Sequence, residues 1–397
     1  MSDSIVIASA ARTPIGGLLG DFSSLAAHQL GAVAIRAAVE RAGIAGDAVN
    51  EALIGNCLMA GQGQAPARQA VLGAGLPQSV GAVTLSKMCG SGMRAMMFAH
   101  DMLRSESADV VIAGGMESMT NAPHLTNMRK GVKYGVAALY DHMALDGLED
   151  AYEKLPNGSG KAMGVFAEDC VSKYRFTREQ MEQFAISSTQ RAKQANEEGS
   201  FDWEMAPVTL TGRNADTVIK FDEQPFKAKL DKIAGLKPAF RKDGTITAAT
   251  SSSISDGAAA LVLMRESTAM KLGCTPIARI RAHAVHAQAP GWFTTAPAGA
   301  IDKVLAKCGW TAKDVDLWEV NEAFAVVTLA AMTDFKLPHE IVNVHGGAVA
   351  LGHPIGASGA RIVVTLLGAL RKRGLKRGVA ALCIGGGEAT ALAVEML

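Results

Sequence analysis

The sequence has almost no net charge and no long apolar run. Lys and Arg total 39 and Asp and Glu total 38, so the formal net charge is +1, and no global electrostatic field recruits nucleic acid or an anionic membrane. The longest charge-poor stretch, residues 52–86 with one charge at Arg68, carries Gln, Asn, Pro and Gly. A membrane-spanning helix needs about 20 apolar residues. We therefore expect neither a membrane nor a nucleic acid as partner.

Paired cysteines and a secretory leader are also lacking. The N-terminus enters an apolar, strand-like run within four residues, with no basic segment before it. We therefore expect reduced thiols, no metal site and a cytoplasmic location. No CxxC pair and no Cys/His cluster at zinc spacing occurs among the six cysteines, which are Cys57, Cys89, Cys170, Cys274, Cys308 and Cys383.

Aromatic residues are few, at 5%, whereas glycine is abundant. The chain has 42 glycines among 397 residues, above the usual share of about 7%. Because 49% of the residues are hydrophobic, the chain is not a disordered one. At about 150 residues per domain, its length predicts two or three domains. The informative glycines lie in three runs, 90–92, 346–359 and 385–387, each beside a cysteine or histidine.

Short apolar runs alternate with helical patterns along the chain. The runs cover 5–9, 51–55 and 109–115, and again 314–321 and 378–395; the helical patterns cover 25–41, 89–104 and 357–373. This alternation predicts an α/β fold with a parallel or mixed sheet and helices on both faces.

The order of motifs indicates an internal duplication. Three anchor pairs recur at offsets of 265, 267 and 271 residues: Asn56 with Asn321, Ser91 with Ser358, and Gly114 with Gly385. We predict two similar α/β halves, residues 1–120 and 250–397. The segment between them, 121–249, carries more charge and a helix that begins at a capping box, Thr177–Gln180, and stops at Gly199. We interpret it as an inserted helical loop domain.

Cys89 stands at a predicted strand-to-helix turn and is followed by small residues. A helix N-terminus favours an anion, so this placement predicts a lowered thiol pKa and a nucleophile. The structural alternative is a small buried cysteine in a glycine turn.

His353 lies in a glycine-rich loop, residues 343–361, before a helix. Taken alone, a histidine is more often structural than catalytic. A phosphate-binding glycine loop is a weaker alternative, because neither GxGxxG nor GxxxxGK[ST] spacing is present. The matching cysteine loop favours a catalytic interpretation.

Cys383 precedes three glycines, 385–387, and Asn321 follows an apolar strand. Bare glycine N–H groups could form an oxyanion hole, in which one lost donor typically costs about 3 kcal/mol of barrier. Tight strand–helix packing would explain the glycines but not the thiol beside them. The Asn321 amide could hold a water or a carbonyl oxygen.

Together these motifs resemble the thiolase family, from Ile5–Pro14 to the final strand. Within the family the chain is most similar to the biosynthetic, acetyl-CoA acetyltransferase type, which has matching motifs at 122–125, 129–133 and 146–148. The resemblance implies two duplicated mixed-sheet halves packed as an αβαβα layered sandwich. It also implies a homo-oligomer, a dimer or tetramer, with residues 123–140 as the tetramer contact.

The resemblance implies residue roles as well. Cys89 is the nucleophile, His353 takes its proton, and Cys383 removes or returns the α-proton of a second acetyl-CoA, giving acetoacetyl-CoA and CoA. One oxyanion site is His353 with a water on Asn321; the other is the backbone N–H of Cys89 and Gly385. No metal or redox cofactor is implied, since the CoA thioesters are substrates.

Further residues are implied for substrate binding. Ser252, Phe240 and Lys227 are candidate CoA contacts, whereas Met163 and Phe324 are candidates for the pocket wall; a core phenylalanine and a solvated lysine are the alternatives. His345 is interpreted as structural.

The chain departs from the family pattern at 161–162, 250–253 and 292–297, which bear on the acyl pocket. A degradative thiolase of broader chain length is therefore the alternative. A decarboxylating ketoacyl synthase would lack the Cys383 thiol, and a non-catalytic CoA-binding relative would need neither thiol.

Overall fold

One mixed sheet runs through the molecule. The computed structural model describes residues 3–129 and 131–397, so Lys130 of the 129–133 motif lies outside the described residues. The strand order is β14 (Leu317–Val320), β15 (Arg377–Ile384), β16 (Glu388–Met396), β13 (Ala278–Ala287), β1 (Ile5–Arg12), β12 (Ser255–Arg265), β5 (Val110–Ser118), β3 (Glu51–Gly55) and β4 (Gly81–Leu85), with β2 (Gly16–Gly17) paired to β12.

The sheet consists of two copies of one topology. In the first, β1, β12 and β5 pair antiparallel and β5, β3 and β4 pair parallel. In the second, β13, β16 and β15 pair antiparallel and β15 and β14 pair parallel. Within the described part of the chain, two residue pairs, Val6 with Arg279 and Ile7 with Ala278, join the copies along the sheet. The predicted duplication is confirmed.

The predicted boundary at residue 250 needs correction. β12 pairs with both β1 and β5, so it completes the first copy, although the boundary at 250 assigned it to the second. The second copy begins at β13. The error arises because the inserted segment separates β12 from the strands that it joins, so position along the chain misplaced it.

One of the three anchor pairs is also out of register. β3 pairs Gly55 with Gly115, and β14 pairs Val320 with Ala381. Because Gly55 and Val320 each precede an anchor asparagine, Gly115 corresponds to Ala381, at an offset of 266. Gly114 and Gly385 are therefore not equivalent, which explains why their offset of 271 differed from the other two.

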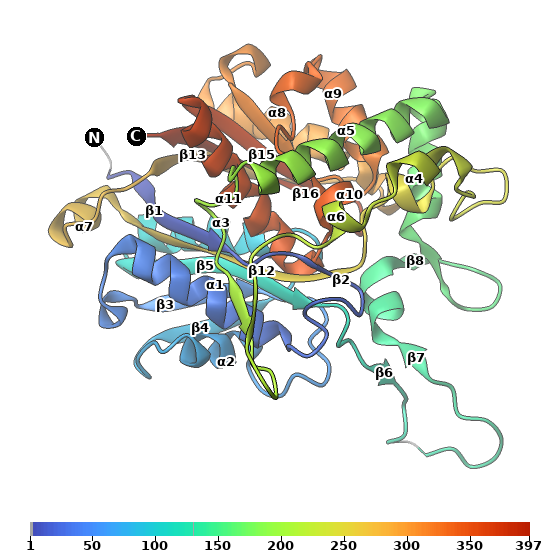
Figure 1. The fold of residues 1–397 in the computed structure, drawn as a ribbon, viewed down its shortest axis with the longest axis horizontal. Helices are drawn as coiled ribbons and strands as arrows, with labels where there is room; N and C mark the ends of the chain where they lie inside the picture. The colour runs from blue at the N-terminus through green and yellow to red at the C-terminus, as the bar shows by residue number, and fades with distance from the viewer. Residues whose placement is uncertain (1–2, 130) are drawn as a thin grey trace.

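Helices form three layers around the two halves of the sheet (Figure 1). α1 (Ala27–Ala42) and α2 (Pro66–Gly73) pack on the outer face of the first half. α3 (Ser91–Arg104) and α11 (Ile355–Arg373) share one core with the inner faces of both halves. α8 (Ala296–Cys308) covers the outer face of the second half, beside α9 (Ala325–Phe335). The αβαβα sandwich is confirmed.

The central helices pack closely through glycine. A Cβ on Gly92 would lie 2.8 Å from the Ala360 nitrogen, and a Cβ on Gly359 would lie 2.5 Å from the Met93 nitrogen. These reciprocal contacts relate α3 and α11 by an approximate two-fold axis. Part of the glycine excess thus serves helix packing.

The inserted segment holds short hairpins and two longer helices. At the start of α5 (Arg178–Glu197), the Gln180 nitrogen donates to Thr177 Oγ1 and the Thr177 nitrogen donates to Gln180 Oε1, which is the predicted capping box. Gly199 follows the helix with a φ of 67°. The remaining elements are β6 (His124–Leu125), β7 (Tyr140–Asp141), β8 (Glu149–Lys154), β9 (Gly160–Ala162), α4 (Met163–Tyr174), α5 (Arg178–Glu197), β10 (Val208–Leu210), β11 (Thr217–Ile219) and α6 (Gln224–Lys227), with α7 (Glu266–Lys271) and α10 (Ala348–Leu351) farther along.

No helix among the described residues combines the length and apolar character that crossing a membrane requires.

Candidate active site

Cys89 lies in a tight turn between β4 and α3. Met88 adopts a φ of 47°, a left-handed conformation that is uncommon for a side chain of this size. The Ser91 hydroxyl holds the turn, since it accepts from the Lys87 nitrogen at 2.8 Å and donates to the Met88 carbonyl at 2.7 Å. Cys89 is thereby fixed just before the first turn of α3 with its side chain half-buried.

The Cys89 thiol is not the acidic group that its helix position predicted. Burial raises its pKa to about 11, although the Gly385 backbone N–H hydrogen-bonds to the sulfur and acts in the opposite direction. Desolvation of the thiolate thus outweighs the helix terminus. The resting group is a thiol that needs a base.

His353 lies between α10 and α11, buried and hydrogen-bonded on one side. Its Nδ1 lies 2.6 Å from Ser358 Oγ, and the same hydroxyl donates to the Pro354 carbonyl at 2.9 Å. A serine has one proton to donate, so Nδ1 carries the hydrogen and Nε2 keeps its lone pair. Nε2 is buried without a partner among the described residues. Burial lowers the His353 pKa to about 3, which leaves the ring neutral and able to accept a proton.

Cys383 is the last residue but one of β15 and lies deep in the core. Burial, with a further contribution from Cys89, raises its thiol pKa well above the ordinary range. Cys89 therefore lies close enough to Cys383 to oppose the ionisation of that thiol. Gly386 and Gly387 follow with φ values of 90° and 83°, a conformation that suits glycine, and the Gly385 N–H before them hydrogen-bonds to the Cys89 sulfur.

Asn321 follows β14, and its amide is only partly satisfied. Its Oδ1 accepts from Arg361 Nη2 at 3.3 Å, whereas its Nδ2 is buried without a partner among the described residues. Burying a polar group unpaired is costly. The amide nitrogen is thus free to donate to a water or a substrate oxygen, whereas the His353 Nε2 lone pair is free to accept a proton.

An apolar wall adjoins Cys383. Met163, Phe240 and Phe324 belong to the same cluster as this thiol. The Phe240 and Phe324 rings meet edge to face with centroids 5.8 Å apart, and a Cβ on Gly385 would lie 3.8 Å from Met163 Sδ. Ser252 binds the Ala323 carbonyl through both its nitrogen and its hydroxyl, beside Phe324.

Two predicted residues lie apart from this group. Lys227 in α6 is exposed and forms an ion pair with Glu223. His345 is buried with its ring edge-on to Phe201, at a centroid distance of 5.7 Å. No contact among the described residues joins either side chain to Cys89 or Cys383.

Glu117 is a buried residue that the sequence reasoning missed. Its carboxylate accepts from the backbone nitrogens of Cys57 (2.9 Å), Leu58 (3.2 Å) and Gly356 (2.9 Å), so it ties the loop after β3 to the start of α11. Burial raises its pKa to about 7. A single charge inside an otherwise apolar strand run, residues 110–118, was the available signal. Ser358 was also missed as a partner of His353, although it served as an anchor residue.

Known proteins resemble this chain over its full length. The family model described as thiolase, N-terminal domain, matches residues 5–267, and that described as thiolase, C-terminal domain, matches 274–396. The chain is 48% identical to a probable acetyl-CoA acetyltransferase of Dictyostelium discoideum, covering 100% of this chain and 94% of that protein. Relatives named as mitochondrial and as cytosolic both occur.

Two solved structures share the fold. An acetyl-CoA acetyltransferase of Bacillus anthracis has a TM-score of 0.95 at 39% identity, covering 100% of this chain and 99% of that one. A thiolase of Ascaris suum, solved in complex with coenzyme A, has a TM-score of 0.92 at 41% identity, covering 99% and 100%. The likeness thus extends over the whole chain.

Proposed function

Because the chain belongs to the thiolase family, we propose that it catalyses the reversible Claisen condensation of two acetyl-CoA molecules to acetoacetyl-CoA and CoA. The observation that carries the proposal is the pairing of two thiols. The Cys89 sulfur accepts a hydrogen bond from the Gly385 N–H, and Cys89 lies close enough to Cys383 to help raise the pKa of the Cys383 thiol. Binding alone would need neither thiol. The acetyl-CoA acetyltransferase names of full-length relatives support the same reaction.

The first half-reaction acylates Cys89. His353 Nε2 takes the thiol proton as the sulfur attacks the acetyl carbonyl, and the C–S bond to CoA then breaks. The neutral imidazole suits this task, because Ser358 holds its proton at Nδ1. The developing oxyanion would be met by His353 with a water on Asn321 Nδ2, or by the Cys89 and Gly385 N–H groups.

Proton balance assigns two steps to Cys383. It donates its proton to the departing CoA sulfur, which leaves a thiolate in the core. That thiolate removes the α-proton of the second acetyl-CoA, and the resulting carbanion attacks acetyl-Cys89. Cys89 leaves as a thiolate and recovers its proton from His353. A thiol with a strongly raised pKa is the stronger base once ionised.

We propose Ser252 and Phe240 as CoA contacts and Met163 and Phe324 as the wall of the acyl pocket, since three of them pack with Cys383. Lys227 is proposed as a basic contact for the CoA phosphates. Lys227→Ala is then expected to raise KM for CoA with kcat unchanged; an unchanged KM would leave Lys227 as a partner of Glu223 only.

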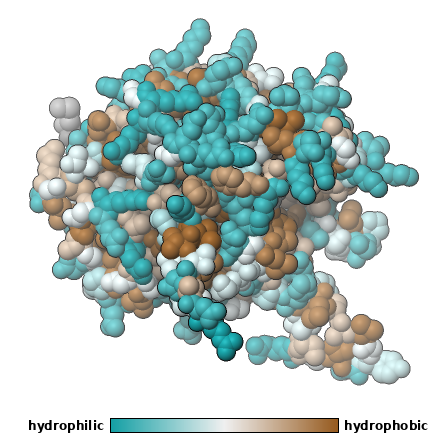
Figure 2. Space-filling model, in the orientation of Figure 1, coloured by the Kyte–Doolittle hydropathy of each residue, from teal (hydrophilic) through white to brown (hydrophobic). Residues whose placement is uncertain are grey.

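A homo-oligomer, a cytoplasmic location and a role in lipid metabolism are further proposals. The arm between β6 and β7 projects from the molecule (Figure 1) and carries exposed apolar side chains, visible at its end in Figure 2. They include Tyr134 and Val136, which are 101% and 96% exposed. A surface of this kind is typical of a contact between subunits. Val136→Ser is expected to lower the mass measured by light scattering if the arm holds a tetramer; an unchanged mass would exclude the arm.

The reaction is tested with acetoacetyl-CoA and CoA. Loss of the enolate absorbance reports thiolysis, and mass spectrometry detects acyl-Cys89. Cys89→Ala should abolish both, and retained activity would exclude Cys89 as nucleophile. Cys383→Ser should slow acylation of Cys89 from acetyl-CoA, because a serine hydroxyl is a poorer proton donor to the CoA sulfur than a thiol, and it should abolish condensation, because the base is lost. Condensation at the rate of the unaltered chain would exclude Cys383 as the base. Thiolysis rates against acyl length then separate this proposal from a thiolase of broader chain length.

A further inference from the structure

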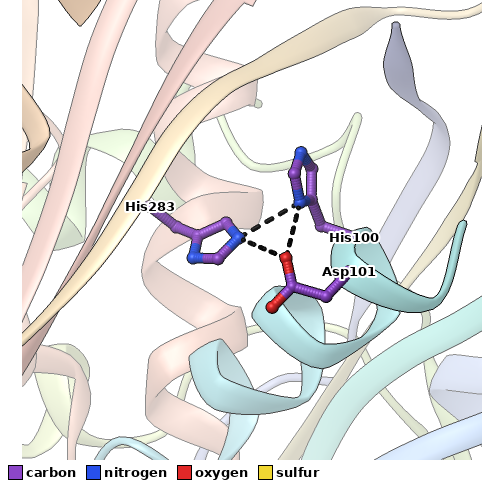
Figure 3. A group of neighbouring side chains, drawn as sticks. All are labelled: His100, Asp101 and His283. Carbon is purple, nitrogen blue, oxygen red and sulfur yellow. Dashed lines mark hydrogen bonds and ion pairs between the residues drawn. The ribbon is translucent and has the colours of Figure 1, made fainter. Parts of the chain in front are cut away.

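Three side chains converge at the far end of α3, at the seam between the two halves. His100 and Asp101 come from α3, and His283 comes from β13 (Figure 3). His100 Nδ1, Asp101 Oδ1 and His283 Nε2 are each 3.1 Å from the other two. The imidazole rings lie edge to face, with centroids 4.7 Å apart and planes at 82°. Three potential ligand atoms therefore form an equilateral triangle.

The triangle has the size that a metal ion requires. Zinc bonds to nitrogen and carboxylate oxygen are about 2.0–2.2 Å long, so neighbouring ligand atoms of a tetrahedral ion lie about 3.3–3.5 Å apart. The observed spacing is within a few tenths of an ångström of that value. An ion would sit about 1 Å above the plane of the three atoms, with its fourth position left for water.

Protonation also suits a metal ion. His100 Nδ1 and His283 Nε2 face each other at 3.1 Å. Two N–H groups pointing into the triangle would oppose each other, so at least one facing nitrogen bears a lone pair. A divalent ion can accept lone pairs from all three atoms at once, which hydrogen bonding among them cannot match.

Nearby cations limit the affinity. The charges of Arg104 and Lys307 reach the His100 ring, and Lys307 Nζ donates to the His283 carbonyl at 2.8 Å. Asp101 supplies the one negative charge of the set. Exposure of the Asp101 side chain, 58%, lets an ion enter from solvent.

We propose that His100, Asp101 and His283 bind a divalent transition-metal ion of the zinc type, which links α3 of the first half to β13 of the second. The site lies outside the group around Cys89, so it acts on stability and takes no part in the condensation. Sequence spacing could not reveal it, because His100 and His283 are 183 residues apart.

The proposal is tested on the full chain with cobalt and zinc. Co²⁺ should give visible d–d bands of tetrahedral intensity at about one ion per chain, without the near-ultraviolet charge-transfer band of a thiolate ligand. Zn²⁺ should quench these bands and raise the unfolding midpoint with the logarithm of its free concentration.

Variants decide whether these three residues hold the ion. His283→Ala should lose the bands and the midpoint rise. Asp101→Asn, at an exposed position that leaves folding intact, should weaken Co²⁺ binding at least tenfold, and His124→Ala, an exposed histidine elsewhere, should behave as the unaltered chain. Absence of bands in the unaltered chain, their persistence in His283→Ala, or a thiolate band that vanishes in Cys89→Ala would each overturn the site.

Discussion

Ser358 offers a sharp test of how the site works, because it touches the base and not the substrate. Its hydroxyl accepts from His353 Nδ1 at 2.6 Å and donates to the Pro354 carbonyl at 2.9 Å. Ser358→Ala removes the only partner of Nδ1 among the described residues. The imidazole is then free to move its proton to Nε2, and the imidazolium that forms during acylation loses its acceptor.

The contact geometry sets the expected size of the effect. A hydrogen bond to a charged group contributes about 1.5–3 kcal/mol, and about 1.4 kcal/mol corresponds to a factor of ten in rate. Since the bond strengthens as His353 gains charge, most of this energy belongs to the transition state. Acylation of Cys89 should therefore slow about 10- to 100-fold in Ser358→Ala.

Rapid-quench mass spectrometry of acyl-Cys89 measures this step directly. Ser358→Thr keeps the hydroxyl and should restore most of the rate. Thr365→Val is the matched control, because Thr365 is another buried hydroxyl on α11 and donates to Glu204 at 3.0 Å; it should lose stability without slowing acylation. An acylation rate in Ser358→Ala equal to that of the unaltered enzyme would refute the positioning role.

Two further predictions concern backbone strain and pH. Gly386→Ala should cost about 1–3 kcal/mol of stability because the φ of Gly386 is 90°, and it should also slow acylation by displacing the Gly385 N–H. The control is Gly374→Ala, at a φ of 64° at the end of α11, which should cost stability alone. Equal acylation rates in the two variants would contradict the oxyanion role. His345 is buried, and its pKa is lowered from 6.5 to about 4. The stability that the neutral ring provides is therefore present above pH 6.5 and is lost as the pH falls toward 4. Over that range the free energy of unfolding of His345→Asn should fall by about 3 kcal/mol less than that of the unaltered chain. An equal fall in the two proteins would contradict this prediction.

Much of the fold was predictable because it follows from local pattern and repetition. The apolar runs and the anchors Asn56 and Ser91 were enough to predict two α/β halves. Strand pairing was not, because the inserted segment separates β12 in sequence from β1 and β5, with which it pairs. Glycines can also mislead an alignment of the two halves, because Gly114 lies inside β5 whereas Gly385, its supposed match, lies in the turn after β15.

The site shows the same division. Cys89 and Cys383 were found because a thiol beside glycines is unusual in sequence. The thiol pKa was predicted in the wrong direction, because burial depends on side chains from the whole fold and outweighs one helix terminus. The His100–Asp101–His283 triangle left no sequence signal, since its two histidines meet only across the seam.

Pseudo-symmetry explains why Cys383 and the free Asn321 amide lie in the second half. Gly115 corresponds to Ala381, so Glu117 corresponds to Cys383, just as Asn56 corresponds to Asn321. In the first half Asn56 Nδ2 donates to Glu117 Oε1 at 2.6 Å, so the amide nitrogen has a partner. In the second half a thiol replaces the carboxylate, and Asn321 Nδ2 has no partner among the residues that the structure describes. One exchange of side chain at an equivalent position therefore creates both the base and the free amide that the condensation needs.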